Sequence, residues 1–544
     1  MTHSRAVYLE TFGCQMNELD SELVSGQLSA LGYRFVASAH EADVVLYNTC
    51  SVRENAEQKV RSRLGEIAQR KRSEPALVVG VLGCMAERDG PDLIRRMPVV
   101  DILCGPSELD RLPALLDNAV RTRASLGGED AGARSAKQTA LQGSASRRTA
   151  TLAAAADRLE LLDLSRAISP TDHNGSAYVR ITRGCNKFCT YCVVPNTRGA
   201  EVHRPPDHIV DECRRLADAG VIEVTLLGQT VNHYRFEHGA AVTLRGVTQP
   251  QKGRAYRGGH RRDPYRGERV TTFADLLKRI HDEVPAIRRL RFVTSYPRDF
   301  GDDALEVMRD SPRICRYLHV PAQSGSDTVL QRMNRGYSVG EYLDFIDRAR
   351  AFLDEPEIGR PLLIAGDMIV GFPGESDEDF DASVRLLERV RYKNCFIFKY
   401  SPRPGTAAQT RLPDDVPDAV KRERNTRLLA AQQTISDEIA RAQIGNTLDV
   451  FVGGLSVRER KQRPGRASDG VGLTVGGRPA QDDADQITRA STAQMTGRTD
   501  GDLIVLFDTP DGREPGDLIG RILPVQIHQA STLTLFGALV GDRA

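Results

Sequence analysis

Apolar residues recur in short runs along the first quarter of the chain, and a segment with helical spacing follows each run. We expect strands at residues 6–12, 42–50, 76–84 and 99–105. Between these runs, apolar positions repeat every three or four residues, as in an amphipathic helix. Apolar runs separated by helices indicate a parallel sheet built from β–α–β units.

The middle of the chain, residues 171–436, repeats this alternation six times. Its strands are expected at residues 177–182, 222–228, 290–296, 316–322, 363–373 and 395–401. Six β–α units are fewer than the eight that close a barrel, so the pattern predicts a partial (β/α)6 barrel. Residues 245–270 interrupt it with eight Arg or Lys against two acidic residues, and we expect this basic insertion to be exposed and mobile.

Short strands separated by turn residues fill the last hundred residues, which is typical of a small β-barrel. A Gly- and Arg-rich insertion interrupts them at about 458–490. Residues 121–170 are rich in Ala, Gly, Ser and Arg, so we expect a flexible linker there, helical near 152–164. The predicted fold is α/β, with a β–α–β parallel-sheet domain, the partial barrel and the small β-barrel at residues 4–120, 171–436 and 439–541.

Composition restricts the compartment and the partners. The 544 residues contain no run of eighteen apolar residues and begin with no signal-peptide core, so we expect a cytoplasmic protein that does not enter the membrane. In a reducing compartment its ten cysteines are better suited to metal binding or catalysis than to disulfides. Because 74 basic residues face 73 acidic ones, a nucleic-acid partner would require local basic patches.

Three cysteines lie within eight residues in "RGCNKFCTYCVVPNTRG", directly after the first barrel strand. They are Cys185, Cys189 and Cys192. This end of a barrel strand is where barrel enzymes hold their chemistry, and the C-x3-C-x2-C spacing suits three corners of a 4Fe-4S cluster. The alternative is a structural zinc site completed by His203 or His173, although zinc ligands usually come in two-residue spacings. Three thiolates on a cubane cluster leave one iron free to bind a small molecule.

A second cysteine triad is scattered through the first domain. Cys14, Cys50 and Cys84 each follow a strand in successive β–α–β units. Because the carboxyl ends of parallel strands open on one edge, we expect the three side chains to converge and to hold a second cluster. The alternative is three buried small apolar residues. The other cysteines are expected to be core residues: Cys104, Cys213, Cys315 and Cys395.

With these motifs the chain resembles the radical S-adenosylmethionine enzymes, and among them the methylthiotransferase family. The similar stretches are "NTCSVRENAEQKV", "GCNKFCTYCVVPNTRG", "LLGQTVN", "HVPAQSGSDTVLQRMNRGY", "DMIVGFPGE" and "YSPRPGTAA". They are most similar to the bacterial members that methylthiolate N6-isopentenyl(dimethylallyl)adenosine next to the tRNA anticodon. The resemblance implies two 4Fe-4S clusters, S-adenosyl-L-methionine, a TRAM-like RNA-binding barrel, a flavodoxin- or ferredoxin-like electron donor, and a monomer that binds the anticodon stem-loop.

The resemblance also implies the chemistry. Carbon 2 of adenine carries an unactivated C–H bond that acid–base groups cannot attack. A reduced cluster on the catalytic triad Cys185, Cys189 and Cys192 would cleave S-adenosylmethionine to a radical that removes this hydrogen. The cluster on Cys14, Cys50 and Cys84 would supply a sulfur that a second S-adenosylmethionine methylates. We expect the two open irons to face one cavity.

Further site residues are implied by family position. Contacts to S-adenosylmethionine are expected from Tyr191, Gly228, Gln229, Ser295, Arg316 and Gln323. Phosphate contacts to RNA are expected from Arg458, Arg460, Lys461, Arg463 and Arg466. The alternative for the S-adenosylmethionine contacts is ordinary packing at strand ends. The alternative for the RNA contacts is a solvated loop. The chain departs from the family at His203, where the family usually has Ser before the arginine of "RGAEVHRP".

Two other functions remain open from the sequence. The same radical methylthiolation could act on threonylcarbamoyl-adenosine in tRNA or on a ribosomal-protein aspartate, since the motifs alone do not define the substrate pocket. A non-enzymatic iron–sulfur RNA-binding sensor would bind no S-adenosylmethionine and would form no 5′-deoxyadenosine.

Overall fold

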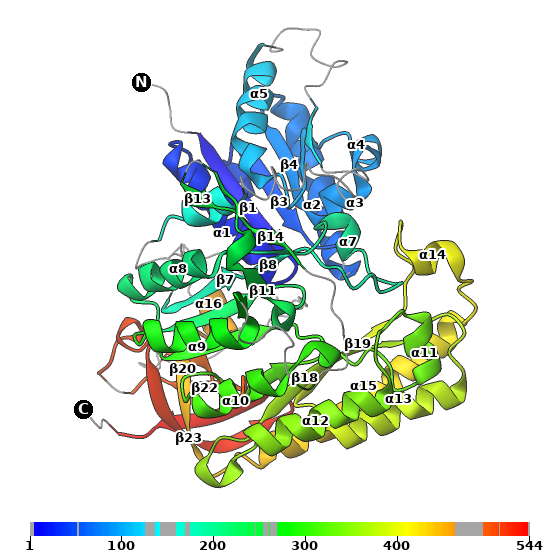
Figure 1. The fold of residues 1–544 in the computed structure, drawn as a ribbon. Coiled ribbons are helices and arrows are strands. Elements are labelled where there is room, and N and C mark those ends of the chain that lie inside the picture. The colour runs from blue at the N-terminus through cyan, green and yellow to red at the C-terminus, as the bar shows by residue number, and fades with distance from the viewer. Residues whose placement is uncertain are drawn as a thin grey trace, which may run out of the picture.

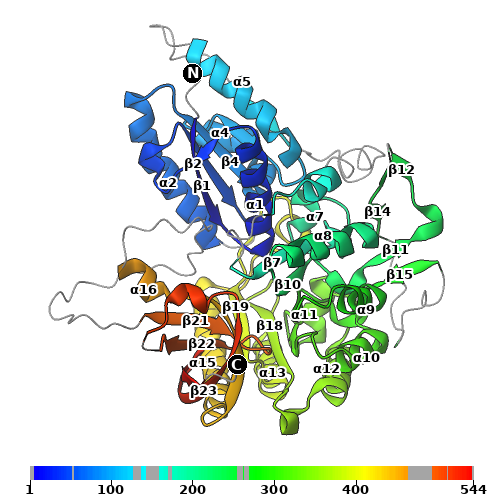
Figure 2. The same ribbon diagram turned by 90° about the vertical axis from the view of Figure 1, so that its left-hand side faces the viewer.

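The computed structural model describes residues 5–51, 54–125, 137–141, 159–168, 174–244, 246–253, 261, 269–462, 493–510 and 512–541. An N-terminal sheet lies above a central partial barrel, and a small C-terminal barrel lies beside the lower part of the central barrel (Figures 1 and 2). In this part of the chain, no helix has both the length and the apolar composition needed to cross a membrane.

The N-terminal unit is a six-stranded parallel sheet in the order β2-β1-β3-β4-β5-β6. Its strands are β1 (Ala6–Phe12), β2 (Arg34–Phe35), β3 (Val44–Thr49), β4 (Val78–Gly83), β5 (Ile102–Cys104) and β6 (Gln138–Ala140). Its helices are α1 (Gln15–Ala30), α2 (Glu54–Ser73), α3 (Cys84–Asp89), α4 (Pro91–Arg96) and α5 (Leu112–Ser125).

Helices cover both faces of this sheet. Leu46 of β3 lies in a core with Leu23 of α1 and Leu116 of α5, whereas its neighbour Val45 lies in a core with Val60 of α2. Because successive strand residues point to opposite faces, a strand buried on both sides needs apolar residues at consecutive positions. Burial of these strands on both faces therefore explains why the apolar runs that predicted the parallel sheet are unbroken.

Part of the expected linker, residues 121–170, belongs to the N-terminal unit instead. β6 pairs in parallel with β5, and residues 159–164 are helical. Leu159 and Leu162 are buried in the core beside α1. The helix at 159–164 falls within the stretch 152–164 for which a helix was expected, whereas β6 and the burial of this helix were not expected of a flexible linker. The remaining linker positions, 126–136, 142–158 and 169–170, lie outside the described residues.

The central unit is the predicted partial barrel of six parallel strands. Two three-stranded sheets, β16-β10-β7 and β17-β18-β19, are joined by a bridge between Leu290 and Ile314. The strands are β7 (Ser176–Arg180), β10 (Glu223–Leu227), β16 (Arg289–Val293), β17 (Tyr317–His319), β18 (Leu363–Val370) and β19 (Asn394–Lys399). The longer helices are α8 (Pro206–Asp218), α9 (Phe273–Glu283), α10 (Asp302–Asp310), α12 (Val339–Leu353), α13 (Asp377–Val390) and α15 (Asp418–Arg441). Shorter helices are α7 (Val194–Thr197), α11 (Asp327–Arg332) and α14 (Ala407–Arg411).

The described part of the basic insertion is structured, although an exposed and mobile segment was expected. β14 (Gln251–Lys252) pairs with β9 (Val202–His203), which also pairs with β8 (Thr182–Arg183). β12 (Thr243–Leu244) and β13 (Val247–Thr248) form a hairpin, and β11 (Arg235–Glu237) pairs with β15 (Val270–Thr272). Residues 254–260 and 262–268 lie outside the described residues.

The C-terminal unit is a closed five-stranded barrel in the order β20-β21-β22-β24-β23, as predicted. Its elements are β20 (Thr447–Leu455), α16 (Val457–Gln462), β21 (Gln494–Arg498), β22 (Ile504–Asp508), β23 (Ile522–Ser531) and β24 (Thr534–Leu539). It packs against the amino ends of the central strands. Arg289, the first residue of β16, donates to the backbone oxygens of Arg498 and Asp449 over 2.8 and 2.6 Å.

Candidate functional site

Cys14, Cys50 and Cys84 lie at the carboxyl edge of the N-terminal sheet. β1, β3 and β4 are neighbours, and Phe12 pairs with Thr49, which pairs with Gly83. Each cysteine follows one of these strand ends within two residues. The structure therefore brings the three side chains together, as the strand-end pattern predicts.

The surroundings of Cys14 favour its thiolate. The Cys50 thiol donates a hydrogen bond to the Cys14 sulfur, and with the nearby Arg198 guanidinium it lowers the pKa of Cys14 to about 6. Gly13 permits this approach, because a Cβ there would lie 2.8 Å from the Cβ of Cys50. A thiolate is the form that ligates a metal.

Cys185, Cys189 and Cys192 lie in one tight loop after β8. The amide of Cys185 donates to the Gly199 oxygen over 3.2 Å, and that of Cys192 donates to the Cys189 oxygen over 3.0 Å. Gly184 enters the loop at φ 67°, and a Cβ there would lie 2.1 Å from the Ala200 oxygen. The loop thus requires glycine where its two arms meet.

The two triads are neighbours. Burial together with the Cys189 and Cys84 sulfurs raises the pKa of Cys192 to about 12, so Cys84 of the N-terminal sheet lies near the barrel loop. Arg198 follows α7 and faces both Cys84 and Cys14, whose negative charges raise its pKa against the effect of burial. The barrel loop therefore reaches the first triad as well as carrying the second.

The sulfur spacing suits iron–sulfur clusters better than single zinc ions. Neither triad brings all three of its sulfurs within 4.8 Å of one another. A zinc ion with Zn–S bonds of about 2.3 Å would hold any two sulfurs within about 4.6 Å. A 4Fe-4S cluster, whose ligands attach to different corners, fits the wider spacing. The two histidines considered as fourth ligands for zinc lie elsewhere: His203 contacts Glu201 and His233, and His173 is outside the described residues.

Tyr191 lies within the cysteine loop and is held by contacts that link the loop to the barrel. Its ring meets that of Phe372 edge to face, with the centroids 6.5 Å apart. The Arg335 guanidinium lies 3.5 Å from the Tyr191 hydroxyl and 3.5 Å from the Cys189 sulfur. Arg335 was not among the predicted site residues, although it stands in the quoted stretch "HVPAQSGSDTVLQRMNRGY".

Four of the predicted S-adenosylmethionine contacts lie at the same end of the barrel. Gly228 and Gln229 follow β10, Ser295 follows β16, and Gln323 lies beyond the carboxyl end of β17. A Cβ at Gly228 would lie 2.2 Å from the Thr182 hydroxyl, so only glycine allows this approach.

Two of these strand ends show features that mark functional sites. The Ser295 hydroxyl is buried and has no hydrogen-bond partner among the described residues. Thr294 and Gln323 both adopt positive φ, at 68° and 72°. This conformation is strained for side chains other than glycine and recurs at ligand sites.

Arg316 is not brought to this end, which corrects its expected place in the pocket. It precedes β17, whose first residue Tyr317 pairs with Leu363, and so lies at the amino end of the strands. Its side chain donates to the Glu355 carboxylate over 2.9 Å, and its amide donates to the Asp500 carboxylate over 3.0 Å. Arg316 therefore joins the barrel to the C-terminal unit.

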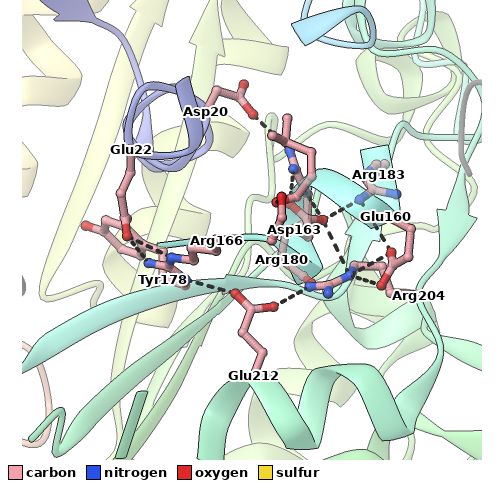
Figure 3. Close-up of polar contacts among 12 residues, drawn as sticks. Asp20, Glu22, Glu160, Asp163, Arg166, Tyr178, Arg180, Arg183, Arg204 and Glu212 are labelled. Carbon is pink, nitrogen blue, oxygen red and sulfur yellow. Dashed lines mark hydrogen bonds and ion pairs between the residues drawn. The ribbon is translucent and has the colours of Figure 1, made fainter. Parts of the chain in front are cut away.

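A buried ion-pair network, shown in Figure 3, includes Arg183 at the start of the cysteine loop. Asp163, in the stretch expected to be a linker, lies between Arg180, Arg183 and Arg204 (Figure 3). Burial alone would raise the pKa of Asp163, but these arginines lower it well below its ordinary value. A charged Asp163 therefore fixes Arg183, which is two residues before Cys185.

The same network includes helix α1. Asp20 accepts hydrogen bonds from Arg180 and from Arg198, each over 2.8 Å. Glu22 contacts Arg166, which also pairs with Glu212 of α8 over 2.9 Å. Sequence reasoning missed these residues, because they come from separate segments of the chain and their pairing has no local pattern.

Two phenylalanines line the inner face of the edge strand β19. Phe396 and Phe398 are 44% and 38% exposed and stack in parallel, whereas the alternate residues Cys395 and Ile397 face the core. Phe396 lies opposite Asp367 of β18. The alternation in "CFIFKYS" carried this signal, but the stretch was interpreted only as one of the six barrel strands.

The predicted RNA contacts are described in part. Arg458, Arg460 and Lys461 lie on α16 of the C-terminal barrel and are exposed. Arg463 and Arg466 lie outside the described residues. The three described cations lie on one short helix, and their role as phosphate contacts stays a prediction.

Comparisons with known proteins cover nearly the whole chain. Residues 6–105 match the family described as Uncharacterized protein family UPF0004, and residues 179–387 match the Radical SAM superfamily. A tRNA-2-methylthio-N(6)-dimethylallyladenosine synthase of Rhodopirellula baltica is 42% identical over 534 residues, which are 98% of this chain and 95% of the relative. One of Porphyromonas gingivalis, strain W83, is 36% identical over 542 residues, with the same two coverages. The solved radical S-adenosylmethionine methyltransferase of Kitasatospora setae is 15% identical over 75% of each chain, with a TM-score of 0.47.

Proposed function

We propose that this chain, which belongs to the family of tRNA-2-methylthio-N(6)-dimethylallyladenosine synthases, converts N6-dimethylallyladenosine next to the tRNA anticodon to its 2-methylthio derivative. The chain is a radical S-adenosylmethionine enzyme. The observation that carries the proposal is the position of the two cysteine triads, which come from different units of one chain and lie side by side.

The enzyme uses S-adenosylmethionine and 4Fe-4S clusters. We assign one cluster to Cys14, Cys50 and Cys84 and the other to Cys185, Cys189 and Cys192. When bound, these groups supply the radical that activates the C–H bond, and the sulfur and methyl group that replace its hydrogen. Each triad offers three thiolates and leaves one corner of its cluster for a ligand.

The residues around the second triad would bind and orient S-adenosylmethionine. Tyr191 and Arg335 form one wall beside Cys189. The buried Ser295 hydroxyl offers an unused hydrogen-bonding group to a polar ligand. Gly228, Gln229 and Gln323 would complete this pocket at the carboxyl ends of the strands, and Arg316 is left out of it.

Arg198 would act at the first triad. Its guanidinium is buried, faces Cys14 and Cys84, and is held by Asp20. A fixed positive charge in a site of low dielectric stabilises thiolates and any sulfur anion that develops beside them. The Asp20–Arg198 pair would thus prepare the first triad for sulfur transfer.

The substrate adenosine would enter through the open side of the barrel and stack on Phe396 and Phe398. Exposed aromatic rings are the usual platforms for bases removed from a stack. The C-terminal barrel, as a TRAM-like domain, would bind RNA phosphates through the cations of α16. Their exposure and shared position on one helix support this role.

We further propose a cytoplasmic monomer that receives electrons from a flavodoxin- or ferredoxin-like protein. Both triads lie on one chain, so the chemistry requires no second copy. Domain roles follow the units of the fold: the N-terminal sheet holds the first cluster, the partial barrel holds the second, and the C-terminal barrel binds RNA.

The test is mass spectrometry of tRNA nucleosides after anaerobic incubation. The mixture contains cluster-reconstituted protein, S-adenosylmethionine, dithionite and tRNA that carries dimethylallyladenosine but no methylthio group. We expect the 2-methylthio-dimethylallyl nucleoside and 5′-deoxyadenosine. Parallel incubations replace this tRNA with threonylcarbamoyl-adenosine tRNA or with the ribosomal protein. Methylthiolation only in one of those, or no 5′-deoxyadenosine with intact clusters, would contradict the proposal.

A further inference from the structure

A separate group of metal-ligating side chains lies behind the cysteine loop. Glu201, His203 and His233 are 0%, 0% and 2% exposed, and one ligand atom from each lies within 4.8 Å of the others. Glu201 and His203 are alternate residues of one extended stretch, so their side chains point to the same side. His233 comes from the turn after β10.

The hydrogen bonds of this group leave one nitrogen without a partner. Glu201 accepts from the Thr230 hydroxyl over 2.8 Å, and its second oxygen lies 2.7 Å from Nδ1 of His233. The Arg235 amide donates to Nδ1 of His203 over 3.4 Å, whereas Nε2 of His203 is buried and has no hydrogen-bond partner among the described residues. A buried polar group without a partner destabilises the fold, so an additional ligand at Nε2 would stabilise it.

The basic insertion closes this group from solvent. Gly253 follows β14, and its amide donates to the backbone carbonyl oxygen of Glu201 over 2.9 Å. A Cβ at Gly253 would lie 2.7 Å from Nε2 of His203 and 2.9 Å from Oε2 of Glu201. Nε2 of His203 and Oε2 of Glu201 therefore border the same space next to Gly253. A residue with a Cβ at position 253 would collide with both atoms.

We propose that Glu201, His203 and His233 bind a divalent transition metal ion, with zinc the best match. Two imidazoles and one carboxylate are a zinc donor set, whereas magnesium and calcium prefer oxygen ligands alone. A buried water would take the fourth position. The ion would join the segment that follows the cysteine loop, through Glu201 and His203, to the turn after β10, through His233.

The site shares no ligand with the iron–sulfur triads and is tested without an activity assay. The full-length protein is reconstituted with iron and sulfide anaerobically, incubated with Zn²⁺ and dialysed. Zinc and iron per chain are then measured by plasma mass spectrometry, and the zinc neighbours by X-ray absorption at the zinc K edge. We expect one zinc per chain with nitrogen and oxygen neighbours at about 2.0–2.1 Å and without sulfur at about 2.3 Å.

Variants identify the ligands. His203→Gln and His233→Gln should each lower bound zinc at least tenfold while the iron content stays unchanged. The matched control is His238→Gln, because His238 lies on the same segment but contacts the Thr271 hydroxyl, and it should keep the zinc. Absence of zinc from the unaltered protein, a sulfur shell around it, or full zinc in both ligand variants would overturn the proposal. The measurement on the unaltered protein decides the outcome even if a variant fails to fold.

Discussion

Asp20 and Arg198 form a buried ion pair, with 2.8 Å between Oδ2 and Nη2. Asp20 lies six residues after Cys14, and Arg198 lies six residues after Cys192. The pair therefore connects the helix that starts at the first triad to the loop that carries the second. The other oxygen of Asp20 binds Arg180 of β7, so one carboxylate fixes the N-terminal sheet on the barrel.

Replacing Asp20 by Asn should destabilise the protein by about 3–5 kcal/mol, because it leaves buried arginine charges without their partner. We also expect methylthio product to fall more than 5′-deoxyadenosine, since the triads lose their fixed spacing. Urea unfolding and the ratio of the two products provide the measurement. Glu22→Gln is the matched control on the same helix: its partner Arg166 keeps Glu212, so the loss should be smaller. Equal effects of the two variants would contradict this role of Asp20.

The junction with the C-terminal barrel should weaken in acid. Burial by itself would raise the pKa of Glu223. The positive charges of Arg498 and Arg291 outweigh this effect and lower the pKa from its ordinary 4.5 to about 2. A carboxyl whose pKa is lowered by folding stabilises the fold fully above pH 4.5, and this contribution disappears as the pH falls toward 2. It amounts to about 3 kcal/mol.

Unfolding midpoints in urea at pH 7, 5, 4 and 3 test this. The difference between the native protein and Glu223→Gln should shrink as the pH falls below 4.5. Glu438→Gln removes an exposed carboxylate paired with Arg391 and should change stability by at most about 1 kcal/mol at each pH. A difference for Glu223→Gln that stays constant from pH 5 to 3 would refute the assignment.

Phe398 should contribute to substrate binding. Stacking of a base on an aromatic ring is worth about 1–3 kcal/mol, so Phe398→Ala should lower kcat/KM for the tRNA roughly 5- to 150-fold. Formation of 5′-deoxyadenosine without tRNA should not change. Leu429→Ala, at an exposed apolar residue of α15, serves as control and should leave both rates unaltered. An unchanged kcat/KM in Phe398→Ala would exclude this ring as a platform.

The cations of α16 should make tRNA binding sensitive to salt. If Arg458, Arg460 and Lys461 contact phosphates, replacing all three by Ala should reduce the slope of log Kd against log salt by roughly 0.7–0.9 for each contact. Arg422→Ala is the control, because it removes a positive charge from an exposed position on α15, and it should leave the slope unchanged. An identical slope in the triple variant would indicate that these side chains are only solvated.

The sequence predicted those parts of the site that follow from strand order. Cys14, Cys50 and Cys84 converge because parallel strands end at one edge, a rule that requires no coordinates. Arg316 was expected at the carboxyl end of its strand but lies at the amino end of β17. The sequence around a short strand does not define the residue at which the strand begins. Asp163 was missed because its burial depends on three arginines that precede or follow the cysteine loop, and that pairing has no local pattern. The Glu201, His203 and His233 group likewise forms only when distant segments meet.

The central claim is that two triads on one chain hold two clusters with different tasks. The most direct measurement compares Cys50→Ala with Cys189→Ala after anaerobic reconstitution. Iron per chain and both products, 5′-deoxyadenosine and the methylthio nucleoside, are quantified. Each variant should lose about half of the iron and all of the methylthio nucleoside. Cys50→Ala should still form 5′-deoxyadenosine, and Cys189→Ala should form none. Methylthio product from Cys50→Ala, or 5′-deoxyadenosine from Cys189→Ala, would contradict the account.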